Sequence, residues 1–149
     1  MTNGLPPPEI ITPLGNFDLD PCTLEDRPWD TAKAHFFLPK FDGLKERWFG
    51  RVWMNPPYGR EVVEWMKLMA EHNDGICLTF ARTDVKWFHK YVFGVATGIL
   101  FLKGRLSFYN KDGIAPNSNA GGPSCLIAYG KYNFDVLKNC SIGGYCVEI

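Results

Sequence analysis

The sequence predicts an α/β fold whose core is a mostly parallel, doubly wound sheet with an antiparallel last pair of strands and a trimmed N-terminal half. In the second half of the chain, apolar runs of strand length alternate with stretches in which apolar residues recur at helical spacing. The first half is weakly patterned and too short for two complete β–α units. A chain of 149 residues is expected to form one domain with a buried core.

The beginning of the chain differs in composition from the rest. Residues 1–8 are rich in proline and polar side chains. We therefore expect residues 1–9 to be a flexible lead-in, and residues 10–149 to form the single domain.

An early strand is expected from Phe17 to Asp20. Its apolar and acidic residues alternate with a period of two, which predicts one apolar face, and Pro21 ends it. Asp20 stands at the carboxyl end of this strand, where open α/β sheets place ligand contacts. It could equally be a cap or turn residue before Pro21. A further short strand is expected at Ala34 to Leu38.

Composition limits the function classes. Apolar residues make up 46% and aromatic residues 15% of the chain, and no apolar run approaches the ~20 residues of a membrane span. We expect a cytoplasmic protein with no membrane partner. Basic and acidic side chains balance at 16 each, so nucleic acid would have to meet a local patch. The five cysteines form no C-x-x-C pair, and no metal site is expected.

The most informative stretch is the apolar run Val52 to Met54, followed by Asn55-Pro56-Pro57-Tyr58. Two consecutive prolines cannot donate ladder hydrogen bonds, so the strand must stop near Asn55. A proline also holds the preceding residue in an extended conformation, which turns the carbonyl groups of Asn55 and Pro56 away from any ladder. We predict a stiff active-site turn. The alternative is a rigid β-to-α connection with Tyr58 as a packing residue.

Such a turn suits the methylation of an exocyclic amine conjugated to an aromatic ring. The amine is a poor nucleophile because its lone pair is delocalised. Hydrogen bonds from its N–H groups to the Asn55 side-chain oxygen and the Pro56 carbonyl would favour a tetrahedral nitrogen, and Tyr58 could stack on the ring. Placing that nitrogen in line with a sulfonium methyl needs positioning and electrostatics, but no covalent intermediate or metal.

Helices and strands alternate after the turn. Apolar spacing predicts a helix over Glu61 to His72, and Ile76 to Phe80 is typical of a buried parallel strand. A second helix is expected from about Val85 to Phe93. Further strands are expected at Ile99 to Leu102, at Leu106 to Tyr109 and at Ser124 to Tyr129, followed by a tail with a short helix and an edge strand. Residues 110–123 form a polar loop long enough to suspect function.

A series of short motifs runs along the chain in order. They are Thr12-Pro13, Phe17 to Cys22, Asp42-Gly43-Leu44 with Trp48, Val52 to Tyr58, Ala81 to Asp84 with Trp87, Gly104 to Phe108, and Pro123-Ser124. Each motif is weak alone, but their order and spacing are specific. Together they resemble the phage-encoded DNA N-6-adenine methyltransferase family, from about Thr12 to Gly130. The resemblance implies transfer of a methyl group from S-adenosylmethionine to N6 of adenine in DNA, on a Rossmann-like methyltransferase fold.

The resemblance also implies roles for the matching residues. Catalysis falls to Asn55, Pro56, Pro57 and Tyr58, and donor contacts fall to Asp20, with Pro21 and Thr12 as weaker neighbours. Loop positioning, substrate contacts or DNA phosphate contacts fall to Arg82, Asp84, Trp87 and Arg105. The target adenine would have to be flipped out of the duplex or single-stranded, because stacked bases hide N6. For a phage- or prophage-encoded enzyme, the cytoplasm would be that of the bacterial host.

The chain departs from the broader methyltransferase superfamily at one point. Residues 20–23 contain no glycine where a glycine-rich turn is usual, so the donor must be cradled differently. The chain has room for a catalytic core and little more, so sequence recognition is short, weak or supplied by a second subunit, and a homo-oligomer stays open. Two rivals remain at this stage. One is an enzyme acting on RNA adenine or a protein glutamine amide, and the other is an inactive nucleic-acid-binding scaffold.

Overall fold

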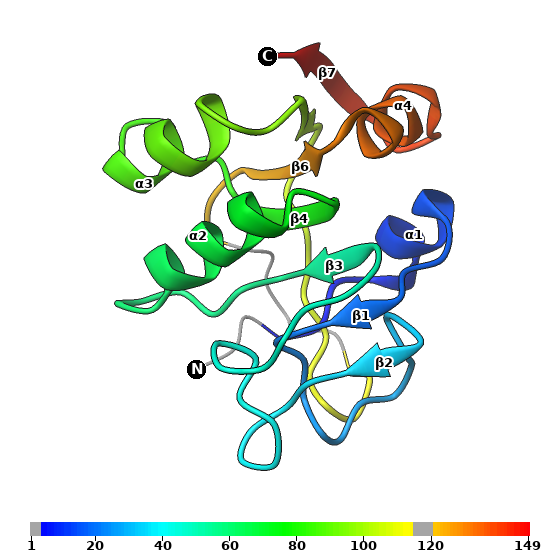
Figure 1. Ribbon diagram of the computed structural model, residues 1–149. Coiled ribbons are helices and arrows are strands. Elements are labelled where there is room, and N and C mark those ends of the chain that lie inside the picture. Colours follow the sequence, from blue (N-terminus) through cyan, green and yellow to red (C-terminus); the bar gives the residue numbers. More distant parts are fainter. Residues whose placement is uncertain (1–3, 115–120) are drawn as a thin grey trace.

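The computed structural model describes residues 4–114 and 121–149. Its centre is a seven-stranded sheet in the order β2-β1-β3-β4-β6-β5-β7 (Figure 1). The strands are β1 (Leu19–Asp20), β2 (Ala34–His35), β3 (Val52–Met54), β4 (Gly75–Phe80), β5 (Gly98–Leu102), β6 (Ser124–Tyr129) and β7 (Gly144–Glu148). Strands β2, β1, β3 and β4 pair in parallel, whereas β6 runs antiparallel between β4 and β5, and β7 runs antiparallel along β5. The α/β fold class is confirmed. The two strands that run antiparallel to the others, β6 and β7, lie on either side of β5.

Helices cover both faces of the sheet (Figure 1). They are α1 (Pro8–Ile11) with the 3₁₀ turn η1 (Thr12–Leu14), α2 (Val62–His72), α3 (Lys86–Phe88) continuing into the π-helical turn η2 (His89–Phe93), and α4 (Lys131–Asn139). Within residues 4–114 and 121–149, no α-helix lies between β1 and β2 or between β2 and β3, as the trimmed N-terminal half predicts. No helix of the described chain is long and apolar enough to cross a membrane.

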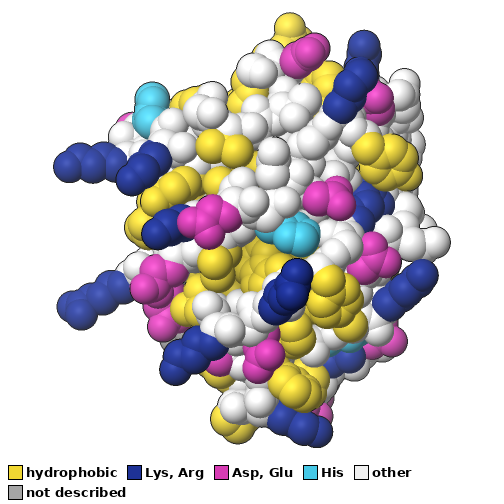
Figure 2. All heavy atoms as spheres, in the orientation of Figure 1, with side chains coloured by type: hydrophobic (Ala, Val, Ile, Leu, Met, Phe, Trp, Pro, Cys, Tyr) yellow, Lys and Arg dark blue, Asp and Glu magenta, His cyan; other side chains and the backbone are white. Residues whose placement is uncertain are grey.

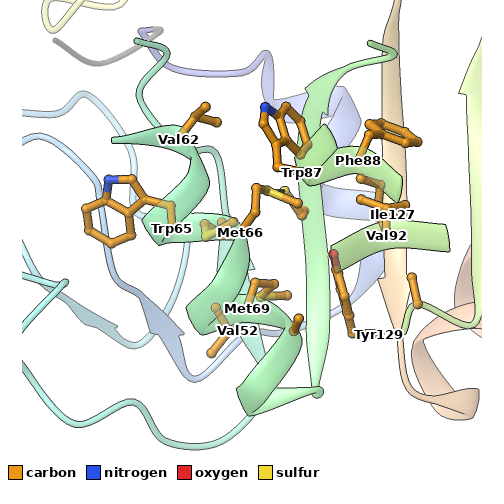
Figure 3. Close-up of a cluster of buried hydrophobic side chains, with 14 of the residues drawn as sticks. Val52, Val62, Trp65, Met66, Met69, Trp87, Phe88, Val92, Ile127 and Tyr129 are labelled. Atoms are coloured by element: carbon orange, nitrogen blue, oxygen red, sulfur yellow. Dashed lines mark hydrogen bonds between the residues drawn. The ribbon is translucent and has the colours of Figure 1, made fainter. Parts of the chain in front are cut away.

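The alternation of side chains along the strands divides the core into two layers. Val52 and Met54 pack with α2 and α3 on one face, while Trp53 packs with α1 and α4 on the other. Figure 3 shows the first layer, in which α2 contributes Val62, Trp65, Met66 and Met69 and α3 contributes Trp87 and Phe88. Each fully buried side chain of this size stabilises the fold by roughly 1.5–3 kcal/mol. Burial on both faces explains why the strands are almost continuously apolar.

Helix α2 follows directly from its sequence. Four of its large apolar residues recur at helical spacing and are buried, whereas Val63 and the charged residues between them are exposed. Asn73 ends the helix in a left-handed conformation with φ of 54°, and its backbone N–H donates to the Met69 carbonyl at 2.9 Å. The helix expected over Glu61 to His72 is therefore confirmed. The expected strands β4, β5 and β6 and the C-terminal helix and edge strand are also present.

The N-terminal segment differs from its expectation. Leu5 is only 3% exposed, and its backbone N–H and C=O both bond to Tyr109, at 2.8 and 2.7 Å. Pro6 and Pro7 are buried as well, and Pro8 begins α1. The expected flexible lead-in therefore does not hold for residues 4–9, because tertiary contacts order them. Residues 1–3 lie outside the described chain.

Two expected strands are also different. Regular pairing in β1 begins only at Leu19, so Phe17 and Leu19 pack in opposite layers instead of sharing one apolar face. In the stretch Leu106 to Tyr109, only Tyr109 pairs, in an isolated bridge to Leu5. Gly104, with φ of 78°, turns the chain after β5 before that point. Of the polar loop expected at 110–123, residues 115–120 lie outside the described chain.

A buried polar node joins α4 to the amino-terminal edge of the sheet. Asn133 is 1% exposed, and its Oδ1 accepts from Arg51 Nε at 2.6 Å. Its Nδ2 donates to Asp74 Oδ1 at 2.9 Å and to the Tyr129 carbonyl at 2.8 Å. Asn133 therefore connects α4 with residues that precede β3 and β4 and with the end of β6.

Asn133→Ala should lower the free energy of unfolding by about 2–3 kcal/mol, because it removes these bonds and leaves the buried Arg51 Nε without its acceptor. Urea unfolding followed by circular dichroism measures the change. Asn139→Ala is the matched control, since its side chain lies on the same helix, is exposed and donates to the Asp135 carbonyl at 2.8 Å. A loss no larger than that of the control would contradict the structural role of the node.

Candidate active site

The site lies where the parallel strands end. Strands β1, β3 and β4 run in the same direction, so the turns that follow them meet at one edge of the sheet. The turns after β1 and β3 carry Cys22 and the stretch Asn55 to Tyr58, and Phe80 is the last residue of β4. The Cys22 thiol donates to the backbone carbonyl of Asn55 at 3.4 Å, which ties the first turn to the second. Burial raises the pKa of Cys22 well above its ordinary value, so this side chain stays a neutral thiol.

Asn55 is 8% exposed, and its side-chain amide has a defined orientation. Its Nδ2 donates to the backbone carbonyl of Gly4 at 3.0 Å. A carbonyl only accepts hydrogen bonds, so the amide must present its NH₂ to Gly4 and turn its oxygen to the opposite side. Pro56 and Pro57 are buried behind it. The expected stiff turn is therefore present.

Tyr58 is fixed by both its hydroxyl and its ring. The hydroxyl lies 2.6 Å from Thr79 Oγ1 and also accepts the backbone N–H of Phe80. The ring stacks on Phe80, with centroids 4.6 Å apart and planes inclined by 13°. Burial raises the pKa of Tyr58 despite these hydrogen bonds, so its hydroxyl stays neutral. One face of the ring is therefore already covered by Phe80, a residue that was not selected from the sequence.

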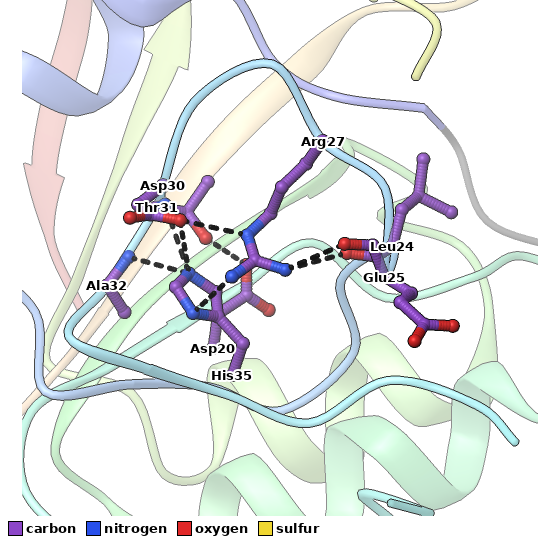
Figure 4. Close-up of polar contacts among 8 residues, drawn as sticks. All are labelled: Asp20, Leu24, Glu25, Arg27, Asp30, Thr31, Ala32 and His35. Carbon is purple, nitrogen blue, oxygen red and sulfur yellow. Dashed lines mark hydrogen bonds and ion pairs between the residues drawn. The ribbon is translucent and has the colours of Figure 1, made fainter. Parts of the chain in front are cut away.

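Asp20 is 3% exposed beneath the first turn and borders a hollow of about 10 Å³. Its carboxylate accepts the Thr31 hydroxyl and the backbone N–H of Cys22, the latter at 3.1 Å (Figure 4). Burial raises the pKa of Asp20 from 3.8 to about 6, although Thr31, Cys22 and the charge of Arg27 act in the opposite direction. Asp20 therefore shapes the turn of residues 20–23, as the turn-residue alternative predicts.

Arg27 organises the loop that carries Thr31 (Figure 4). Its guanidinium donates to the Leu24 and Glu25 carbonyls at 3.1 Å each, and Nε bonds Asp30 Oδ1 at 3.1 Å. Arg27 Nη2 lies 2.9 Å from His35 Nδ1. Burial and the neighbouring Arg27 lower the pKa of His35, so the ring is neutral at physiological pH.

A cavity of about 300 Å³ opens beside the turn at Asn55. Its lining comes from residues 21–25 after β1, from Phe36, Phe41 and Asp42 after β2, and from Pro57 with the start of α2. Aromatic rings and a carboxylate suit a nucleoside, whose base can pack on the rings and whose hydroxyls can donate to an acid. The residues present therefore fit the adenosine part of S-adenosylmethionine. Across residues 4–114 and 121–149, no group of three or more His, Cys, Asp or Glu could hold a metal ion.

Gly43 allows the loop after β2, which lines one side of this cavity, to approach residues 21–25, which line another side. A Cβ at this position would lie 1.9 Å from the Pro21 carbonyl oxygen and 2.8 Å from Trp65 Cη2. The Gly43 carbonyl accepts the Trp48 indole N–H at 2.8 Å, which holds the loop in place. The glycine missing from residues 20–23 is thus replaced by one that packs against the same turn from another loop.

The structure does not gather every residue selected from the sequence. Thr12 is exposed in a separate hollow with Gly15 and Lys33, away from the cavity. Trp87 is 8% exposed and packs in the core beside Phe88, with ring centroids 5.5 Å apart. Its motif position therefore coincides with a packing position, and this burial gives no support to a direct substrate contact.

The exposed members of that set lie in loops at the carboxyl edge. Arg82 and Asp84 follow β4, and the Arg82 guanidinium lies 5.4 Å from the Phe80 ring centre. Arg105 is exposed after β5. Basic and acidic side chains are interspersed on the face seen in Figure 2, which agrees with the zero net charge. Any attraction for DNA is therefore local.

Sequence reasoning assigned no role to several residues of this candidate site. Asp42 and Gly43 stood in a matching motif but had no assigned role, and Phe36 had no signal beyond its aromatic ring. Phe80 could have been suspected from its position at the end of a parallel strand, beside the strand that leads into the turn.

Comparison with known proteins gives a family match. The family model described as DNA N-6-adenine-methyltransferase (Dam) matches residues 9–138, which include all the strand ends that form the site. No curated protein and no solved structure matches the chain. The family transfers a methyl group from S-adenosylmethionine to N6 of adenine in DNA. Since the match covers most of its length, the chain belongs to the DNA N-6-adenine-methyltransferase family.

Proposed function

We propose that this enzyme holds the target adenine against the turn Asn55 to Tyr58 and activates N6 there. The Asn55 side-chain oxygen and the Pro56 carbonyl oxygen would accept the two N6–H groups, which withdraws the nitrogen lone pair from the ring. The observation that carries the proposal is the bond from Asn55 Nδ2 to Gly4, because it turns the amide oxygen away from Gly4 as an acceptor. The base would stack on the Tyr58 face opposite Phe80.

The aromatic cavity is our candidate for the donor site. Bound S-adenosylmethionine supplies an electrophilic methyl carbon on a sulfonium centre. Asp42 would accept hydroxyl hydrogens of the ribose, and Phe36 and Phe41 would pack on the adenine ring. Pro57 lines this cavity directly after Pro56, so the donor cavity and the proposed amine acceptors adjoin. That proximity supports transfer by positioning alone.

The target base must leave the helix stack to reach Asn55. Unstacking costs a few kcal/mol in duplex DNA, so single-stranded or mismatched adenines should be modified more readily. Arg82 and Arg105 are exposed at this edge and are our candidates for phosphate contacts. Loss of affinity with rising salt would report such contacts. Recognition of a specific DNA site and assembly with a second copy of the chain are further proposals for this DNA-bound enzyme.

Asn55→Ala should reduce methyl transfer by at least ~100-fold, because it removes an acceptor aimed at the reacting amine. Transfer of radiolabelled methyl to adenine-containing DNA measures the loss, with adenine-free DNA as the acceptor control. Circular dichroism and donor binding should be unchanged, and Asn139→Ala should keep full activity. Label on adenine-free DNA, or an active Asn55→Ala enzyme, would contradict the proposal.

Asp42→Asn should weaken S-adenosylmethionine binding by about tenfold, because a neutral amide oxygen accepts hydroxyl hydrogens less strongly than a carboxylate. Isothermal titration calorimetry in the absence of DNA gives the affinity. Glu46→Gln is the matched control, since it makes the same charge change at an exposed position of the same loop. Equal effects of the two substitutions would exclude Asp42 from the donor site.

Asp20→Asn tests whether the buried carboxyl group contributes to the pH dependence of the free energy of unfolding. Because the pKa in the folded state is raised to about 6 from 3.8, the folded protein binds the proton more tightly than the unfolded chain. The carboxyl group therefore favours folding most below pH ~4, and this contribution is lost as pH rises through about 6. The amide variant should lack this pH dependence and be more stable at pH 7.5, by on the order of 1–3 kcal/mol.

Melting temperatures between pH 4 and pH 8 measure both proteins. Identical pH profiles would mean that Asp20 does not titrate in this range. Donor binding by the variant tells whether the charge itself is used, since a purely structural carboxylate would leave the affinity unchanged.

A further inference from the structure

The hydrogen bond between Gly4 and Asn55 joins the turn Asn55 to Tyr58 to a part of the chain that the family model does not match. Gly4 precedes the matched residues 9–138. Its carbonyl is 3.0 Å from Asn55 Nδ2, and Gly4, Leu5 and Pro6 line a hollow of only about 10 Å³ together with Asp20 and Asn55. The segment is thus packed directly against the catalytic turn.

Several contacts hold this segment in place. Leu5 forms a reciprocal pair of backbone hydrogen bonds with Tyr109 from the loop after β5, and the Tyr109 ring meets Trp29 edge-on, with centroids 5.3 Å apart. Gly4 has φ of +81°, and a Cβ at this position would lie 2.9 Å from the Tyr109 carbonyl oxygen. Only glycine fits this backbone without strain. The position of the Gly4 carbonyl is therefore determined by the fold.

We propose that Gly4 is a positioning residue that aims the amide of Asn55 and makes asparagine, and not aspartate, the required residue at position 55. The inference rests on the proposed function of Asn55. A carbonyl accepts the amide NH₂ but offers nothing to a carboxylate, which also only accepts. With aspartate, two acceptor oxygens would face each other at the distance now spanned by the hydrogen bond, which is unfavourable for a buried carboxylate.

The test is a double-mutant cycle on the full chain, with Gly4→Ala, Asn55→Asp and the double variant. Gly4→Ala should lower kcat about tenfold with little change in either KM, because a displaced carbonyl misaligns the amide without removing a substrate contact. Asn55→Asp should lower kcat at least ~100-fold in the presence of Gly4, but about tenfold or less in the Gly4→Ala background. Gly143→Ala is the matched control, since its Cβ would meet nothing within 4 Å.

Side-chain NMR separates this proposal from the proposed function. The Asn55 NH₂ signals, assigned by their absence in Asn55→Asp, should shift in Gly4→Ala and stay unchanged in Gly143→Ala. Leu5→Ala is the second variant if Gly4→Ala does not fold, since it loosens the same segment and should shift the same signals. Multiplicative losses of kcat, or unshifted signals, would overturn the positioning role of Gly4. Absence of methyl transfer by the unchanged chain would overturn the proposed function and leave the NMR comparison valid.

Discussion

The parallel pairing of β1, β3 and β4 is the constraint on which the site depends. Leu19 pairs with Val52, and Val52 with Gly75, so the three strands start level and leave the sheet at one edge. Gly75 permits the close approach of β4, because a Cβ there would lie 2.1 Å from the Val52 carbonyl oxygen. This register brings Phe80 at the end of β4 against Tyr58. With a different register, the Tyr58 ring in the turn after β3 would lose its stacking contact with Phe80.

The first half of the sheet shows how a short chain can build the proposed donor cavity without a glycine-rich turn. In the usual arrangement, glycine lets a backbone approach a ligand or a neighbouring helix closely. Here the close approach is between two loops, with Gly43 against the Pro21 carbonyl, and aromatic residues after β2 form the opposite wall. No helix lies between β1 and β2 or between β2 and β3, so the loops after β1 and β2 form the cavity walls there. The buried Asp20, with its raised pKa, is a cost of folding that such a compact turn imposes.

Local sequence patterns predicted the parts of the molecule that local physics determines. The prolines after Asn55 end β3 whatever surrounds them, and the spacing of apolar residues in α2 specifies its buried face. Patterns failed where tertiary contacts decide. Leu5 is ordered by pairing with Tyr109, although its proline-rich neighbours are typical of a flexible segment. Trp87 stands at a motif position for which loop positioning, substrate contact or DNA phosphate contact was expected, and in the fold it is a core residue.

The contacts that escaped sequence reasoning share one physical property. The Gly4 carbonyl and the Pro21 carbonyl act through the backbone, which every residue type carries, so no side-chain pattern announces them. Gly4 and Asn55 are also 51 positions apart, which excludes any local signal. The backbone contact with Gly4 bears on which residue type the motif requires at position 55. Asparagine and aspartate both offer an acceptor oxygen to an amine, yet only asparagine can also donate to a carbonyl. Under the proposed positioning role of Gly4, a neighbour that the motif does not contain decides which of the two residues the turn requires.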